Sequence, residues 1–319
     1  IRGGGNMSAL HFDTLVWHWP IAIYLFLAGA SAGAMFFAVL LKHFVLKHNA
    51  YQSGFVQAAC IVAPVAVMAG LGILVLDLTK PFDFWKILVF YNPKSVMSMG
   101  VLILLIYQVF MFMWIGLLFR KPIDAWCESR FPIVLKLTAW LSRFEATITG
   151  LLVIFSLALG AYTGFLLSAL PGYPMLKNPV LPLLFLASGL SSGAAFSLLG
   201  GVLLNANPNA KEVHFIHKVE IPLILVEIVL IFTFFMGLVL SGGQSKFAAF
   251  NAIGYGFWGW VFWIGIVGIG LSGPLAMNLF MTATSKRKWA YVAGTACLSL
   301  IGVLLLRNFI LYTGQMTVV

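Results

Sequence analysis

Long apolar segments recur along this chain, and short polar segments separate them. Each apolar segment holds roughly 20 residues, the length that an α-helix needs to cross about 30 Å of hydrocarbon. Because backbone polar groups inside lipid must pair within their own segment, each is expected to be helical. An amphipathic segment at 132–145 precedes the fourth of them. The pattern predicts an all-α integral membrane protein with eight transmembrane helices, at residues 20–41, 54–76, 96–119, 146–170, 180–204, 219–240, 257–280 and 289–312.

The basic residues between these segments predict an orientation, since Lys and Arg accumulate in cytoplasmic loops. Twelve of them lie in the connections after the first, third, fifth and seventh spans, and six lie in the termini and the other connections. We therefore expect a multi-pass protein of the bacterial inner membrane with both termini periplasmic. The net charge of +10 follows from this topology and is poor evidence for a nucleic-acid partner.

A repeated motif predicts two related halves. Residues 29–36 (GASAGAMF) in the first span match residues 189–196 (GLSSGAAF) in the fifth, and Tyr-Thr-Gly ends both the fourth and the eighth span. Four crossings separate the members of each pair, so the halves are expected to run in the same direction. We expect a periplasmic segment at 1–19 and two pseudo-symmetric four-helix bundles at 20–170 and 171–319. Small residues also recur at helix contacts without any duplication, which leaves that alternative open.

Four ionisable residues lie inside or at the end of these apolar segments: Asp77, Glu220, Glu227 and Arg307. They stand out because the chain is 61% hydrophobic and only 9% charged. A charge at the bilayer centre costs about 2.5–3.5 kcal/mol even on the mildest scales, and such residues usually mark a proton, ion or substrate path. Seven residues separate the two glutamates, so we expect both on one face of a helix.

The predicted orientation places a group of polar side chains near the outer ends of the spans: His18, Tyr24, Asp77, Tyr162 and Arg307. Simpler explanations are open for these residues. His18 and the tyrosines are typical of the aromatic belt at the lipid headgroups, Asp77 suits a helix cap, and Arg307 suits a side chain that extends to the interface. Glu220 suits an interfacial pair with Lys218. Glu227 lies too deep for these explanations, and a functional role is favoured there.

The sequence contains no recognisable motif for a cofactor of its own. The histidines all lie outside the predicted spans or at their ends, so we expect no haem, whose axial ligands would lie within them. Cys60, Cys127 and Cys297 have no metal-binding spacing, and we expect no metal site. A quinone headgroup needs hydrogen-bonding partners such as Tyr or His and a nearby group that exchanges protons. The outer group of residues supplies these types.

Several of these features together carry a resemblance to a known family: residues 17–20 (WHWP), Tyr24 with the following Gly29, Ser31 and Gly33, Asp77 at the end of the second span, Tyr162 within residues 160–164 (GAYTG), Glu220, Glu227 and Arg307. In these features the whole chain resembles the NrfD/PsrC family, the membrane-anchor, quinone-binding subunits of polysulfide reductase-type molybdopterin oxidoreductases.

The resemblance implies a haem-free membrane subunit of anaerobic respiration that oxidises menaquinol near the periplasmic face. It implies electron transfer to an iron–sulfur, ferredoxin-like partner on the periplasmic side, and through it to a molybdopterin catalytic subunit that reduces the sulfur compound. By this resemblance, Tyr24, Asp77 and Tyr162 react with the quinol, and His18 joins the two tyrosines in holding it. Glu220, Glu227 and Arg307 then serve a proton path from the cytoplasm or the integrity of the site.

A secondary transporter is the alternative that the residues leave open. Duplicated halves and intramembrane carboxylates are common in transporters, and so are helices broken near the midplane. Pro64, Pro222 and Pro274 provide such positions in the second, sixth and seventh spans. The terminal electron acceptor and the direction of electron flow also stay open, because both depend on the partner subunits.

Overall fold

The computed structural model describes residues 9–12, 14–47, 50–77, 92, 95–127, 132–208, 210–286 and 288–317. For residues 77, 132–134 and 283–284 only the backbone is described. Eight helices in this part of the chain are long and apolar enough to cross a membrane, as the sequence predicted. They are α1 (Trp19–Leu40), α2 (Gly54–Asp77), α4 (Val96–Leu118), α7 (Glu145–Ser168), α8 (Leu181–Leu203), α9 (Lys211–Ser241), a composite of α11 (Phe257–Trp260), η5 (Val261–Ser272) and α12 (Gly273–Phe280), and α14 (Trp289–Gln315).

Shorter helices extend or connect these spans. They are η1 (Leu41–Leu46), η2 (Ala50–Gln52), α5 (Arg120–Cys127), α6 (Pro132–Leu141), η4 (Ser142–Phe144), α10 (Gly243–Ile253) and α13 (Ala283–Lys286). The predicted amphipathic segment corresponds to α6 and η4. The sixth span differs from its prediction, because α9 begins at Lys211 rather than at residue 219. This earlier start places His214 and His217 inside a helix, whereas the sequence placed every histidine outside the spans or at their ends.

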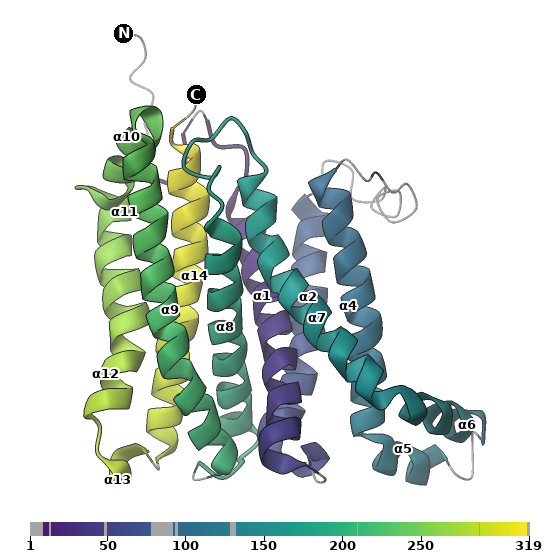
Figure 1. Ribbon diagram of the computed structural model, residues 1–319. Helices are drawn as coiled ribbons and strands as arrows, with labels where there is room; N and C mark the ends of the chain where they lie inside the picture. The colour runs from purple at the N-terminus through teal and green to yellow at the C-terminus, as the bar shows by residue number, and fades with distance from the viewer. Residues whose placement is uncertain are drawn as a thin grey trace.

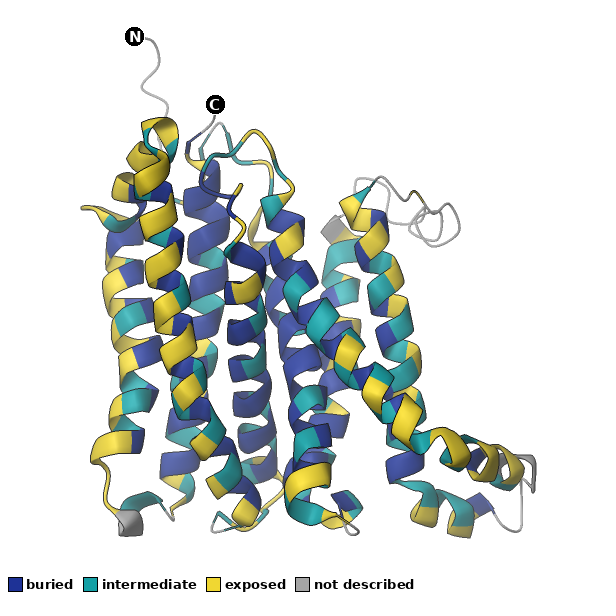
Figure 2. Ribbon diagram, in the orientation of Figure 1, coloured by how far each residue is buried: buried dark blue, intermediate teal, exposed yellow. Residues whose placement is uncertain are grey.

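Helices α1 and α8 occupy the centre of the molecule, with α2, α4 and α7 on one side and α9, α12 and α14 on the other (Figure 1). The central pair is the most thoroughly buried, whereas the outer helices turn exposed apolar residues outward, as Figure 2 shows. In a protein that spans a membrane, such outward-facing apolar residues meet lipid rather than water.

The two copies of the repeated motif meet where α1 crosses α8. A Cβ atom placed on Gly33 would lie only 2.3 Å from the backbone oxygen of Gly189, and one on Gly193 would lie 2.2 Å from the backbone nitrogen of Ala34. Such contacts are possible only without side chains, and small residues allow membrane helices this close approach. The motif therefore sets how the centre of the molecule packs.

The start of α1 and the end of α14 lie at the same end of the bundle (Figure 1). The Thr14 hydroxyl donates a 2.7 Å hydrogen bond to the backbone oxygen of Gln315. The buried Gln315 side chain accepts from the backbone nitrogens of Val16 and Trp17, at 3.0 and 2.8 Å. An even number of crossings requires this arrangement. It does not establish which side of the membrane the termini face, so the periplasmic assignment stays a prediction.

Candidate functional site

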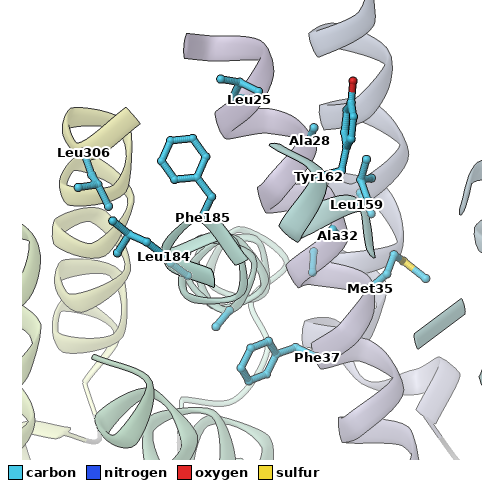
Figure 3. Close-up of a cluster of buried hydrophobic side chains, with 14 of the residues drawn as sticks. Leu25, Ala28, Ala32, Met35, Phe37, Leu159, Tyr162, Leu184, Phe185 and Leu306 are labelled. Atoms are coloured by element: carbon cyan, nitrogen blue, oxygen red, sulfur yellow. The ribbon is translucent and has the colours of Figure 1, made fainter. Parts of the chain in front are cut away.

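Two buried tyrosines lie together near the end of the bundle that carries the termini. Tyr24 belongs to the second turn of α1 and Tyr162 to the last two turns of α7, and each is 5% exposed. Their phenol groups are close enough to interact electrostatically. In Figure 3 the Tyr162 side chain rises beside Ala28 of α1, and its phenol oxygen points away from the apolar side chain of Leu159. The structure thus places a pair of phenol groups between helices, rather than in an outward-facing aromatic belt.

Glycines of two neighbouring helices lie against these rings, and one of them, Gly100, makes room for the Tyr162 ring. A Cβ on Gly100 of α4 would overlap the Tyr162 ring, at 1.6 Å from Cζ and 1.9 Å from the phenol oxygen. A Cβ on Gly70 of α2 would lie 3.4 Å from Cδ2 of Tyr24. Four helices therefore converge on the pair: α1, α2, α4 and α7. Neither glycine stands out in the sequence.

His18 and Asp77 are the other two residues that the sequence predicted to hold the quinol or react with it. His18, the residue directly before α1, is exposed. Asp77 is the last residue of α2, but its side chain lies outside the described residues. Their proposed contacts with a quinone stay predictions.

Arg307 of α14 is fully buried at the junction of four helices. Its Nη1 donates to the Thr163 hydroxyl at 3.2 Å and its Nη2 donates to the backbone oxygen of Phe185 at 2.8 Å. The guanidinium also lies over the Phe185 ring, 3.8 Å from its centroid. A Cβ on Gly29 of α1 would come within 3.0 Å of Nη2. The side chain therefore does not extend to the lipid interface, and its partner Thr163 is the residue directly after Tyr162.

Glu227 of α9 is 2% exposed and faces the same junction. It attracts Arg307 electrostatically, and the Ser191 hydroxyl lies within its hydrogen-bonding reach. Its Oε1 atom has no hydrogen-bond partner among the described residues. Beside it lies a cavity of about 10 Å³, which Ser191, Gly302 and other residues line. That volume is at the lower limit for one water molecule.

Glu220, two turns earlier on α9, is 1% exposed and lies in a hydrogen-bonded network. Its Oε2 atom is 2.8 Å from Nδ1 of His217, and its Oε1 accepts from the Ser299 hydroxyl at 3.1 Å. The Asn278 amide donates to Oε2 at 3.4 Å. The sequence left open an interfacial pair with Lys218. In the structure Lys218 is exposed, and the carboxyl group is instead buried against His217.

Most of the partners of Glu220 were not predicted from the sequence. Ser299 and Asn278 are small polar residues of a kind that occurs in many membrane helices, so nothing in the pattern marked them. His217 was placed before the span because α9 starts earlier than the apolar run does. Glu212 is the signal that would have placed His217 inside the helix. It lies in the first turn of α9, where acidic residues are enriched.

These features define a class of protein: a multi-pass helical membrane protein whose core holds a series of ionisable and hydroxyl side chains. Comparison with known proteins identifies the family. The chain belongs to the polysulphide reductase NrfD family, whose model matches residues 7–319. The family expected from the sequence is thereby confirmed.

Three relatives illustrate the range of this family. Protein NrfD of Escherichia coli (strain K12) is 44% identical over 315 residues, which cover 98% of both proteins. A polysulfide reductase component of Wolinella succinogenes is 38% identical over 309 residues, which cover 97% of both proteins. A selenate reductase component of Mesobacillus selenatarsenatis is 26% identical, over 91% of this protein and 72% of that one. The chain is thus a membrane protein of a family that includes subunits of oxidoreductase complexes.

Proposed function

We propose that this chain oxidises menaquinol between α1, α2, α4 and α7, and passes the electrons to an iron–sulfur partner subunit. The observation that supports it most is the buried pair of Tyr24 and Tyr162, with glycines beside both rings. Phenol groups can donate hydrogen bonds to the two oxygens of a quinone headgroup or accept from those of a quinol. His18 lies about two turns before Tyr24, at the entrance to this region.

Oxidation of a quinol releases two electrons and two protons, so the site must also accept protons. In the proposal Asp77, at the end of α2, takes the two quinol protons one after the other and passes the first on before it takes the second. A carboxylate within hydrogen-bonding reach is a suitable base for this step. The two tyrosines hold the headgroup while the electrons leave. Residues of this chain thus bind, orient and deprotonate the quinol. The sulfur compound is reduced by a molybdopterin subunit beyond the iron–sulfur partner.

A second part of the proposal concerns a proton path through the core. Thr163, Arg307, Glu227, Ser299 and Glu220 form a succession of polar side chains that leads away from the tyrosine pair. Ser299 lies one turn before Gly302 on α14, and Gly302 lines the small cavity at Glu227. An unpartnered carboxyl oxygen is costly inside a protein unless a water or a proton satisfies it. This succession supports a proton path between the quinol site and the cytoplasm.

The proposed orientation follows from the distribution of basic residues. Both termini and the tyrosine pair then face the periplasm of a bacterial inner membrane, where the iron–sulfur partner docks. We also propose that residues 20–170 and 171–319 are duplicated four-helix halves. The contact between the two copies of the motif at the α1–α8 crossing supports this relation.

Replacement of Asp77 by Asn tests the proposed chemistry, because the amide keeps the size of the carboxyl group and cannot accept the proton. We expect quinol-driven reduction by the assembled complex to fall about 100-fold or more, in the range attributed to a lost general base. Reduction driven by an artificial donor to the partner subunits should stay normal. The control is Asp124→Asn, at a carboxylate on α5 that pairs with Arg120. Normal quinol turnover by Asp77→Asn would show that this residue takes no part in the mechanism. Solute transport by the purified protein alone would favour the alternative function, a secondary transporter.

A further inference from the structure

A cleft lined by both polar and apolar side chains opens at the end of the molecule opposite the termini. It has a volume of about 920 Å³ and lies between α9, α12–α13 and α14. Its lining includes His214, His217, Asn278, Lys286 and Tyr291. The cleft is large enough for many water molecules, each of which takes about 30 Å³ in the liquid. The quinol site proposed above does not use it.

His217 lies between this cleft and Glu220. The imidazole lines the cleft and is 9% exposed, whereas Glu220 behind it is 1% exposed. The Nδ1 atom of His217 is 2.8 Å from Oε2 of Glu220, and its Nε2 atom has no hydrogen-bond partner among the described residues. One ring nitrogen therefore contacts the buried carboxyl group. The other is a buried atom without a partner, in a ring that lines the cleft, so a water that enters from the cleft would satisfy it.

Neighbouring side chains hold this pair in place without competing for its proton. The Tyr291 hydroxyl donates to Oδ1 of Asn278 at 2.7 Å, which turns the amide nitrogen of Asn278 toward Glu220. The rings of Tyr291 and His217 are also in contact, with centroids 5.3 Å apart. An amide cannot take up or release a proton at ordinary pH, whereas imidazole does both near neutrality. Among the groups around Glu220, His217 is the one suited to relay a proton.

We propose that His217 transfers protons between the water of this cleft and Glu220. The inference rests on the proposed role of Glu220 in a proton path. When a proton moves from the cleft to Glu220, Nε2 takes a proton from water and Nδ1 gives its proton to the Glu220 carboxylate. The ring is then neutral with its proton on Nε2. The starting tautomer returns when the ring turns, Nδ1 takes a proton from water of the cleft and Nε2 gives its proton back to water, with no net change in the number of protons. The same steps in reverse order move a proton from Glu220 to the cleft, and no electrons are transferred in either direction.

Two variants of His217 in the assembled, membrane-embedded complex separate a relay from a structural role. His217→Gln keeps a side chain that can donate a hydrogen bond to Glu220 but cannot relay a proton. His217→Ala leaves a space beside the cleft that imidazole from solution can enter. We expect each to lower quinol turnover about 100-fold or more, within the range for lost acid–base catalysis. Added imidazole should restore turnover in His217→Ala and have no effect on His217→Gln.

The matched control is His214→Gln, since His214 lies one turn earlier on α9, lines the same cleft and is exposed. It should keep wild-type turnover, and all three variants should accept electrons normally from an artificial donor. Wild-type turnover in His217→Gln would overturn the proposal. So would a loss in both His217 variants that imidazole does not relieve, because that result assigns a purely structural role.

Glu220→Gln, measured alongside, distinguishes this inference from the proposal on which it rests. If Glu220→Gln turns over quinol normally, the proton role of Glu220 fails, and the relay fails with it. If Glu220→Gln is impaired while His217→Gln is normal, the proton path stands and its entrance at His217 is wrong.

Discussion

The polar residues of the core differ in how visible they are in the sequence. Glu227 and Arg307 stand out because a charged side chain in an apolar segment is rare, and both prove to be buried at one junction. Gly100 is just as important for the geometry, since it is the residue that accommodates the Tyr162 ring. Nothing distinguished it from the other glycines of the chain, because only its neighbour across the helix interface gives it a role.

At this scale we predict that Arg307→Met destabilises the protein. The change removes two hydrogen bonds from a charged donor, each worth about 1.5–3 kcal/mol, and leaves Glu227 without its compensating charge. The midpoint of thermal unfolding of the purified protein should fall clearly, whereas Lys246→Met, at an exposed cation of α10, should leave it unchanged.

A double variant measures the coupling between Arg307 and Glu227. Arg307→Met combined with Glu227→Gln should be less unstable than the sum of the two single changes, by roughly 0.5–3 kcal/mol, because neither charge is then left alone. Strict additivity would show that the two side chains do not depend on each other.

Among the elements, packing between helices was harder to foresee than the helices themselves. The apolar segments predicted the spans because length and hydrophobicity suffice for that. They did not predict that the middle of the seventh span is a π-helix, η5, which crosses α14 with Gly270 against Gly302. A Cβ on Gly302 would lie 2.2 Å from the Cα atom of Gly270. Such a local rearrangement depends on the neighbouring helix, and π-helical segments are frequent at functional sites.

At the same scale we predict that Gly33→Ala and Gly193→Ala weaken the α1–α8 crossing. Each added methyl group would meet backbone atoms at 2.2–2.3 Å, so the helices must separate. The matched control is Gly150→Ala on α7, where nothing lies within 4 Å of the added atom. Because alanine is the better helix former by about 1 kcal/mol, Gly150→Ala should keep or raise the midpoint of thermal unfolding. Equal midpoints for all three variants would contradict the assigned packing.

For the whole molecule, the two ends of the bundle carry different chemistry. The tyrosine pair lies toward the end with the termini, and the cleft at His217 lies at the other end. Buried polar side chains occupy the core between them. If quinol is oxidised at one end and protons are exchanged at the other, turnover must respond to the membrane potential, since moving one charge across 100 mV changes the free energy by about 2.3 kcal/mol.

The location of the bound quinone is the most direct test of this account. A photoreactive menaquinone analogue is added to the intact complex, and the labelled peptides are identified by mass spectrometry. We expect labelling in α4 around Gly100 and in α7 around Tyr162, and competition by menaquinone. Labelling should be lost in Gly100→Leu, whose side chain would overlap the tyrosine ring and displace it. Specific labelling confined to the cleft at His217 or to the outer face of α9, with α4 and α7 unlabelled, would contradict it.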